Sequence, residues 1–281
     1  MYKKVTIEKI KNLKGSRDPF ATITAYDFPS AQLVDSLGIP VILVGDSLAM
    51  VVLGYESTIP VTVEEMLVFV GAVSRGAHNS LVVADMPFMS YQASVEEAVR
   101  SAGRFIKMGG ANAVKIEGGA SMTKQIEQIV CAGIPVMGHV GLTPQSINQM
   151  SGYKVQGKTR RAAVSILNDA KAVEQAGAFS IVLEGVPAEL GKLITEQLTI
   201  PTIGIGAGPH CDGQIQVYHD VIGLFSGFVP SHAHQYENCK EKISQAIKTY
   251  VAEVKNKSFP KSQHYKTLSP DTLKSLRDLL K

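Results

Sequence analysis

The sequence predicts an α/β protein of the (β/α)8 TIM barrel class. Short apolar stretches rich in β-branched residues alternate along the chain with segments of helical periodicity. The apolar stretches contain few polar positions, which is typical of parallel strands covered by helices. The alternation repeats about eight times, and the 281 residues can hold one such barrel, whose typical size is about 250 residues. An open, doubly wound sheet is the alternative.

The apolar stretches are expected to form the strands of the barrel. All are clear except the last, which is weaker. They cover residues 20–27, 41–46, 81–87, 113–118, 135–141, 180–186, 201–208 and 221–227.

Helices are expected near residues 28–37, 63–78, 94–108, 121–132, 160–176 and 187–197. Thr62 with Glu65, and Ser94 with Glu97, have the spacing of capping boxes at two helix starts. The sequences LGIP, GGAN, AGIP and AGAF precede strands, and glycine there permits the left-handed conformation that ends a helix.

The two ends of the chain are expected to lie outside this repeat. A helix-like stretch at 6–14 precedes the first strand and is expected to plug the floor of the barrel. Residues 238–254 are expected to form a closing helix. We therefore predict one catalytic barrel over 1–255 and a basic C-terminal extension over 256–281, with a last amphipathic helix near 270–280.

Composition limits the classes of function. The net charge is +3, but residues 239–281 carry ten Lys and Arg against four Asp and Glu, whereas the first 238 residues carry 18 against 21. Such a segment is more often a solvated helix face than a tail that binds nucleic acid or lipid. Trp is absent, which argues against stacking on single-stranded nucleic acid.

The expected location is the cytoplasm. No apolar run reaches the roughly 18 residues needed to span a bilayer, and the N-terminus has no signal-peptide pattern. The three cysteines are odd in number and far apart, so they predict neither a disulfide framework nor a zinc cluster. We expect small-molecule ligands, with no nucleic-acid or membrane partner.

Ionisable side chains gather at the C-terminal ends of the predicted strands. In a (β/α)8 barrel these ends share the rim that holds the active site. Each residue alone could be a helix cap, an internal salt bridge or a core histidine. Several carboxylates close together, however, need a compensating charge such as a bound cation. The candidates are Asp46, Ser47, Asp85, Lys115, Glu117, His139 and Glu184.

The residue types favour a hard divalent cation. Carboxylates without a Cys cluster or paired His suit Mg2+ or a similar ion, which would polarise a carbonyl group and stabilise an enolate. Lys115 and Glu117 are two residues apart on a strand, so both face the same way. The glycine-rich GIGAG (204–208) follows a strand and marks either a close approach to a ligand or a tight barrel turn.

Longer strings give a more specific indication. They resemble the signature blocks of the ketopantoate hydroxymethyltransferase family, in order from about residue 4 to about 265. The departures are Ala49, where the family usually has glycine, and PSHAHQY (230–236), where it has a PKFVRQY-like string. The strings are TAYD (24–27), VGDSLAM (44–50), DMPFMSY (85–91), GANAVKIEGG (110–119), GHVGLTPQSIN (138–148), GYKVQGKT (152–159), LEGVP (183–187), GIGAG and DGQIQVYHD (212–220).

The resemblance implies a barrel of the phosphoenolpyruvate-mutase type. It implies transfer of a hydroxymethyl group from 5,10-methylenetetrahydrofolate to 3-methyl-2-oxobutanoate, giving 2-dehydropantoate for pantothenate and coenzyme A biosynthesis. It also implies a homo-oligomer, a decamer in bacterial members.

The matching strings also imply roles for individual residues. The magnesium ligands are expected to be Asp46, Asp85 and Glu117, and Glu184 is expected to be the general base. The expected oxo-acid contacts are Asp46, Ser47, Asp85 and Lys115, to which His139 is added from its place on the rim.

Two alternatives stay open. A phosphoenolpyruvate-mutase or isocitrate-lyase-like carbon–carbon lyase would share the metal carboxylates. Such lyases typically use a Cys on a mobile loop, and this chain has no KKCGH-like string. An oxo-acid- or folate-binding barrel without turnover would share the fold, but the complete acid–base set argues against it.

Overall fold

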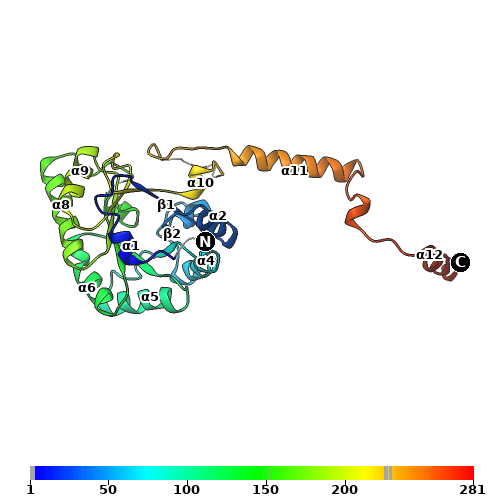
Figure 1. Ribbon diagram of the computed structural model, residues 1–281, viewed down its shortest axis with the longest axis horizontal. Coiled ribbons are helices and arrows are strands. Elements are labelled where there is room, and N and C mark those ends of the chain that lie inside the picture. The colour runs from blue at the N-terminus through cyan, green and yellow to red at the C-terminus, as the bar shows by residue number, and fades with distance from the viewer. Residues whose placement is uncertain (1–3, 151, 225–226, 228–229) are drawn as a thin grey trace.

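The computed structural model describes residues 4–150, 152–224, 227 and 230–281. Its eight strands form a closed barrel in which all neighbouring strands are parallel and β8 pairs with β1 (Figure 1). This confirms the predicted fold class and excludes the open sheet. The strands are β1 (Phe20–Thr24), β2 (Val41–Val44), β3 (Leu81–Asp85), β4 (Ala113–Glu117), β5 (Val136–Gly141), β6 (Ser180–Glu184), β7 (Thr202–Ile205) and β8 (Gly213–Gln216).

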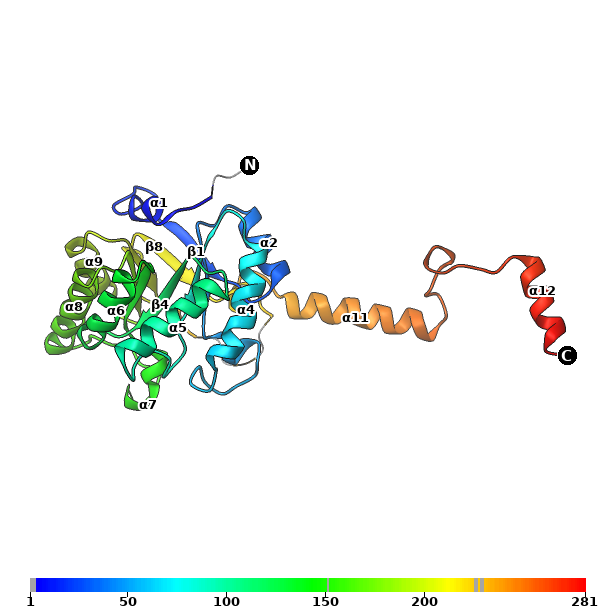
Figure 2. The ribbon, with the colours of Figure 1, turned by 90° about the horizontal axis from the view of Figure 1, so that it is seen from below.

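Helices surround the barrel close to where the sequence predicts them (Figure 2). The Thr62 and Glu65 side chains form a full capping box at α4, and at α5 the Ser94 side chain accepts the Glu97 N–H. The helices are α2 (Phe28–Ser36), α4 (Val63–Gly76), α5 (Val95–Lys107), α6 (Thr123–Cys131), α8 (Arg160–Gln175) and α9 (Ala188–Gln197). Shorter segments follow the strands: α3 (Leu48–Val51), η1 (Ala120–Met122), η2 (Pro144–Ser146), α7 (Ile147–Met150) and α10 (Tyr218–Val221).

The expected eighth strand over 221–227 is wrong. Val221 ends α10, residues 222–223 form a turn, and residues 225–226 lie outside the described residues. The eighth strand is instead β8, in which buried and half-buried positions alternate and two residues are glutamine. It lacks the continuous apolar run that identifies the other strands.

Side-chain alternation divides the core into two parts. Leu43, Val83 and Met137 pack inside the barrel, whereas their neighbours Ile42 and Val82 pack between strands and helices. Both faces of most strands are buried, and for this reason those strands are largely apolar. The inward positions recur with a period of two, so the register that fills the lower barrel also points the strand-end residues into its upper part.

The N-terminal segment lies at the floor of the barrel, opposite the rim. Ile10 of α1 (Ile7–Lys11) is fully buried in the cluster that fills the barrel interior. Lys14 Nζ donates to an Asp212 carboxylate oxygen at 3.0 Å, and the Gly15 N–H donates to the other at 2.9 Å. These bonds tie the segment to the start of β8.

The helix expected over 238–254 forms as α11 (Cys239–Lys255), but it projects from the barrel instead of covering it. None of its residues is buried. Figures 1 and 2 show it leaving the barrel beside α2 and leading to η3 (Ser262–His264) and α12 (Pro270–Leu279). The division of the chain at residue 255 stays a prediction. Among the described residues, no helix combines the length and apolarity needed to cross a bilayer.

Candidate active site

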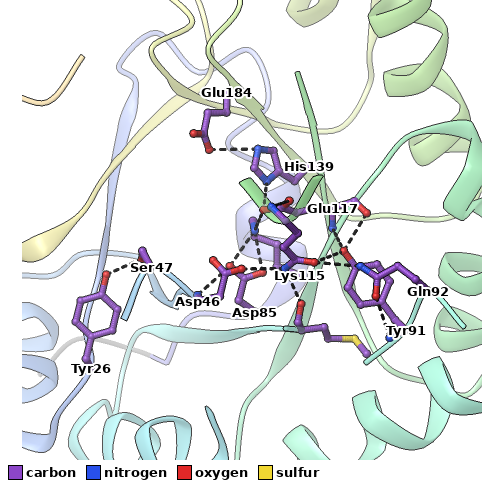
Figure 3. Close-up of polar contacts among 12 residues, drawn as sticks. Tyr26, Asp46, Ser47, Asp85, Tyr91, Gln92, Lys115, Glu117, His139 and Glu184 are labelled. Carbon is purple, nitrogen blue, oxygen red and sulfur yellow. Dashed lines mark hydrogen bonds and ion pairs between the residues drawn. The ribbon is translucent and has the colours of Figure 1, made fainter. Parts of the chain in front are cut away.

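The ionisable side chains predicted at the rim converge on one cavity of about 260 Å³ at the C-terminal ends of the strands. Register brings them together, because Asp85 pairs with Lys115 and Glu117 pairs with His139 on neighbouring strands. Figure 3 shows these side chains pointing toward one another. The cavity is lined by every residue selected from the sequence: Asp46, Ser47, Asp85, Lys115, Glu117, His139 and Glu184.

Lys115 lies at the centre of this charged group. Its Nζ is 2.8 and 2.9 Å from the two carboxylate oxygens of Asp85 and 3.6 Å from Glu117 Oε1. Burial lowers the pKa of Lys115, but the charges of Asp85 and Glu117 outweigh burial and raise it above its ordinary value. Lys115 therefore keeps its positive charge and can hold a carboxylate or an enolate oxygen.

His139 joins two carboxylates. Its Nδ1 is 3.3 Å from Glu117 Oε1, and its Nε2 is 3.4 Å from Glu184 Oε2. Burial and the Lys115 charge lower the pKa of His139, but Glu117 and Glu184 more than offset them, and the pKa rises to about 9. The imidazolium present at neutral pH therefore attracts the Glu184 carboxylate as an ion pair, although neither ring nitrogen has hydrogen-bond geometry to a described residue, and the Glu184 side chain is 15% exposed.

The carboxyl groups of Asp46, Asp85 and Glu117 lie close together, and the positive charges of Lys115 and His139 compensate them unequally. Burial, followed by the charges of Asp85 and Glu117, raises the pKa of Asp46 well above its usual value. Burial also raises the pKa of Asp85, although Lys115 offsets part of the effect. For Glu117 the nearby His139 and Lys115 outweigh burial and hold the pKa below its usual value. Asp46 therefore has the greatest need of a further positive charge.

The chemistry of these donors fits a hard divalent cation. Within the described part of the chain, no three acidic, His or Cys side chains are already gathered as a complete metal site. Lys115 instead pairs with both oxygens of Asp85, while the side-chain amide of Gln145 donates to Asp46 Oδ2 at 2.9 Å. A cation would compete with these contacts and take its other ligands from water or substrate.

Gln145 and Tyr91, two neutral residues that the sequence analysis did not select, link the carboxylates of the site through hydrogen bonds. Gln145 also donates its Nε2 to the Met86 carbonyl at 2.9 Å and its backbone N–H to Glu117 Oε2 at 3.1 Å. The Tyr91 hydroxyl donates to Gln145 Oε1 at 2.7 Å and lies 3.1 Å from the main-chain N of Glu117. Both residues lie in strings that resemble the family, and this resemblance was the only signal in the sequence that could have identified them. Neither is charged, so neither belongs to the pattern of ionisable residues at the strand ends.

Ser47 lies at the edge of the charged group. Its Oγ is 2.8 Å from the Tyr26 hydroxyl. Figure 3 shows the two side chains facing each other. Of the two departures from the family pattern, Ala49 is fully buried in α3. The start of PSHAHQY places Pro230, Ser231 and His232 on the cavity wall.

The close approaches made by the glycine loop after β7 are to protein atoms. Gly206 and Gly208 have φ values of +61° and +79°. A Cβ atom on Gly208 would lie 2.4 Å from the Ala188 Cβ atom, and one on Gly206 would lie 3.1 Å from the His232 Cβ atom. This arrangement favours the interpretation as a tight barrel turn.

Comparison with known proteins identifies a family. Residues 4–262 match the model of the family described as ketopantoate hydroxymethyltransferase. The chain is 53% identical over 274 residues to the 3-methyl-2-oxobutanoate hydroxymethyltransferase of Dehalococcoides mccartyi strain CBDB1, with 98% of each chain covered. It is 54% identical over 273 residues to the protein of that name from Carboxydothermus hydrogenoformans, with 97% of this chain and 99% of the relative covered.

Solved structures of lower identity share the architecture. A phosphoenolpyruvate phosphomutase from Streptomyces platensis subsp. rosaceus is 14% identical with a TM-score of 0.61, covering 98% of this chain and 96% of that one. A 2,3-dimethylmalate lyase of the PEP mutase/isocitrate lyase superfamily is 16% identical with a TM-score of 0.58, covering 97% and 94%. The predicted barrel type is confirmed, and at these identities the likeness concerns the fold alone.

Proposed function

Because the chain belongs to the ketopantoate hydroxymethyltransferase family, we propose that it transfers a hydroxymethyl group to 3-methyl-2-oxobutanoate. The one-carbon donor is 5,10-methylenetetrahydrofolate, and the product is 2-dehydropantoate, an intermediate of pantothenate and coenzyme A biosynthesis. The observation that carries this proposal is the pairing of Lys115 with Asp85 in the cavity that Glu184 also lines.

The residues that would hold Mg2+ are Asp46, Asp85 and Glu117. The raised pKa of Asp46 and the oxygen-only donor set support this assignment. When bound, the ion supplies Lewis-acid stabilisation of the enolate oxygen.

Lys115 and Ser47 bind and orient the oxo acid. The Lys115 ammonium group lies close to two carboxylates and can hold the substrate carboxylate or the oxygen on which negative charge develops. The Ser47 hydroxyl adds a second polar contact at the cavity edge.

Glu184 takes the proton from C3 of the oxo acid. The C–H bond breaks, its electron pair enters the enolate, and the proton passes to the Glu184 carboxylate, which His139 orients. Water breaks the two C–N bonds of the donor's methylene bridge, which releases tetrahydrofolate and leaves the one-carbon unit as formaldehyde. The enolate carbon C3 then forms a bond to the formaldehyde carbon, and the proton held by Glu184 passes to the formaldehyde oxygen, which becomes the hydroxyl group of the product.

A homo-oligomer is part of the proposal, a decamer by resemblance to the family. The exposed apolar side chains of α11 support it, because a second copy of the chain would cover them. A cytoplasmic location suits the three cysteines, which are free.

The test is loss of deuterium from C3 of 3-methyl-2-oxobutanoate, followed by NMR with and without Mg2+ and the folate donor. We expect Mg2+-dependent exchange without folate and hydroxymethylated product only when folate is added. Cleavage of a 2-alkylmalate or isocitrate-like acid in place of exchange would favour the lyase alternative. A folded protein that gives neither exchange nor product would contradict the proposal.

A further inference from the structure

Asp220 is a buried carboxyl group that the proposed mechanism does not use. It lies on α10, directly after β8, and lines the same cavity as the charged residues of β3 to β6. The residue is 6% exposed, and its Oδ1 is buried without a hydrogen-bond partner among the residues that the structure describes. Burial raises the pKa of Asp220, and the His232 charge offsets part of that rise.

Two nearby donors are engaged elsewhere, and the His232 imidazole, which lines the same cavity, makes no hydrogen bond to Asp220 Oδ1. The Tyr26 hydroxyl pairs with Ser47 Oγ at 2.8 Å, and the Gln216 side-chain amide donates to the His232 carbonyl at 3.4 Å. A buried oxygen that lacks a donor costs free energy, on the order of 1–3 kcal/mol. Because Oδ1 itself has almost no accessible surface, a ligand in the cavity reaches it only after a rotation of the Asp220 side chain, and N–H groups brought to it would then recover this cost.

The surrounding wall suits a flat ring. Ile205, Ile215, Val217 and Pro230 line the cavity together with Asp220. Apolar side chains of this kind cover the faces of a ring, while a single polar group fixes its edge. The ligand chemistry that this combination recognises is a planar heterocycle with N–H donors on one edge.

We propose that Asp220 binds the reduced pterin ring of the one-carbon donor by accepting hydrogen bonds from its N3–H and 2-amino groups. This inference rests on the proposed function. Two adjacent N–H donors match the two oxygens of a carboxylate, as in other bidentate pairs. The pyrazine side of the pterin, which carries the methylene carbon on N5, is then free to face the oxo acid held by Lys115 and Ser47.

The test compares Asp220→Asn with wild type in steady-state kinetics. Asparagine keeps the shape and replaces one acceptor oxygen by a donor, so the KM for 5,10-methylenetetrahydrofolate should rise at least about tenfold. The KM for the oxo acid should change far less. Glu189→Gln is the matched control, because Glu189 is an exposed carboxylate in the first turn of α9 on the same rim. It should leave both KM values as in wild type.

A second measurement does not depend on the variant folding. Wild-type protein should bind tetrahydropterin at least about tenfold more tightly than an analogue in which hydrogen replaces the 2-amino group, measured by calorimetry with Mg2+ and oxo acid present. Equal affinities for the two pterins, or an unchanged folate KM in folded Asp220→Asn, would overturn the assignment of Asp220. If wild type also failed to exchange the C3 deuterium, the proposed function itself would fail. If wild type exchanged the C3 deuterium but gave equal pterin affinities, or if the variant kept the wild-type folate KM, only the pterin site would be rejected.

Discussion

Lys115 is held by carboxylates on two strands, and this arrangement predicts a specific kinetic defect. Lys115→Met should raise the KM for the oxo acid and also lower kcat, because the same ammonium group contacts substrate and transition state. The change should be at least about tenfold in kcat/KM, with the folate KM much less affected. Lys107→Met, at an exposed position on α5, is the control. A variant in which only the folate KM moved would show that Lys115 does not hold the oxo acid.

Glu184 can be tested apart from the binding groups. Glu184→Gln keeps the size of the side chain and removes the base, so C3 exchange should fall by roughly 100-fold or more. Affinity for Mg2+ and oxo acid, measured by calorimetry, should stay close to that of wild type, because Glu184 contacts His139 and not the carboxylates assigned to the ion. Exchange at the normal rate would mean that another residue takes the proton.

The charged part of the site could be predicted from the sequence because strand ends and a period of two determine where those side chains point. Lys115 and Glu117 illustrate this, since their spacing alone predicts a shared face and their Nζ to Oε1 distance is 3.6 Å. Gln145 and Asp220 could not be predicted in the same way. Both lie in loop segments or short helices after strands, where backbone direction depends on packing and not on periodicity.

At the scale of elements, Asp35 joins α2 to the segment before β3. One oxygen accepts the backbone N–H groups of Asn79 and Ser80 at 2.9 and 2.7 Å, and the other accepts the Asn79 side-chain amide at 2.8 Å. Burial raises the pKa of Asp35, but these hydrogen bonds outweigh burial and hold it below its ordinary value. The carboxylate therefore stabilises the fold at pH values above its unfolded pKa of about 4, and this contribution is lost as pH falls through the lower folded pKa.

Asp35→Asn should therefore lower the free energy of unfolding by about 1–3 kcal/mol at pH 7. The difference from wild type should shrink as the pH falls through the folded pKa, because wild type then also loses the charge. Urea denaturation at a series of pH values measures the difference in unfolding free energy at pH 7 and its change with pH. Asp18→Asn, which alters an exposed carboxylate, is the control. A difference that stays constant with pH would show that the charge of Asp35 contributes nothing.

Strands were predicted correctly where their sequence is a continuous run of apolar residues. Six strands, β2 to β7, are buried or nearly buried throughout and were located by that pattern, whereas β1 has an exposed Ala21 and β8 alternates two glutamines with buried residues. Gln214 and Gln216 have to reach polar partners, the Gly208 and His232 carbonyls, so this strand could not be continuously apolar. The segment 221–227 is more apolar, but part of it is helix and turn.

At the scale of the whole molecule, the C-terminal arm of residues 239–281 presents apolar side chains that the chain itself leaves exposed. Ile243, Ile247, Tyr250 and Val254 follow one another at helical spacing on α11, and each is about half exposed. The arm is basic while the preceding 238 residues are slightly acidic. Charge and apolarity therefore both favour contact between the arm of one copy and the body of another.

The corresponding prediction is that wild type is larger than the 30.2 kDa chain in light scattering at micromolar concentration. Ile247→Glu places a charge within the apolar stripe of α11, and burying that charge in an interface is costly, so this variant should dissociate at concentrations where wild type stays assembled. Gln245→Glu adds a carboxylate on the opposite face of the same helix and should leave the mass unchanged. If Ile247→Glu and Gln245→Glu gave the same mass, α11 would not be the contact. A wild-type mass equal to one chain would reject the oligomer, because the exposed stripe would then have no second copy to cover it.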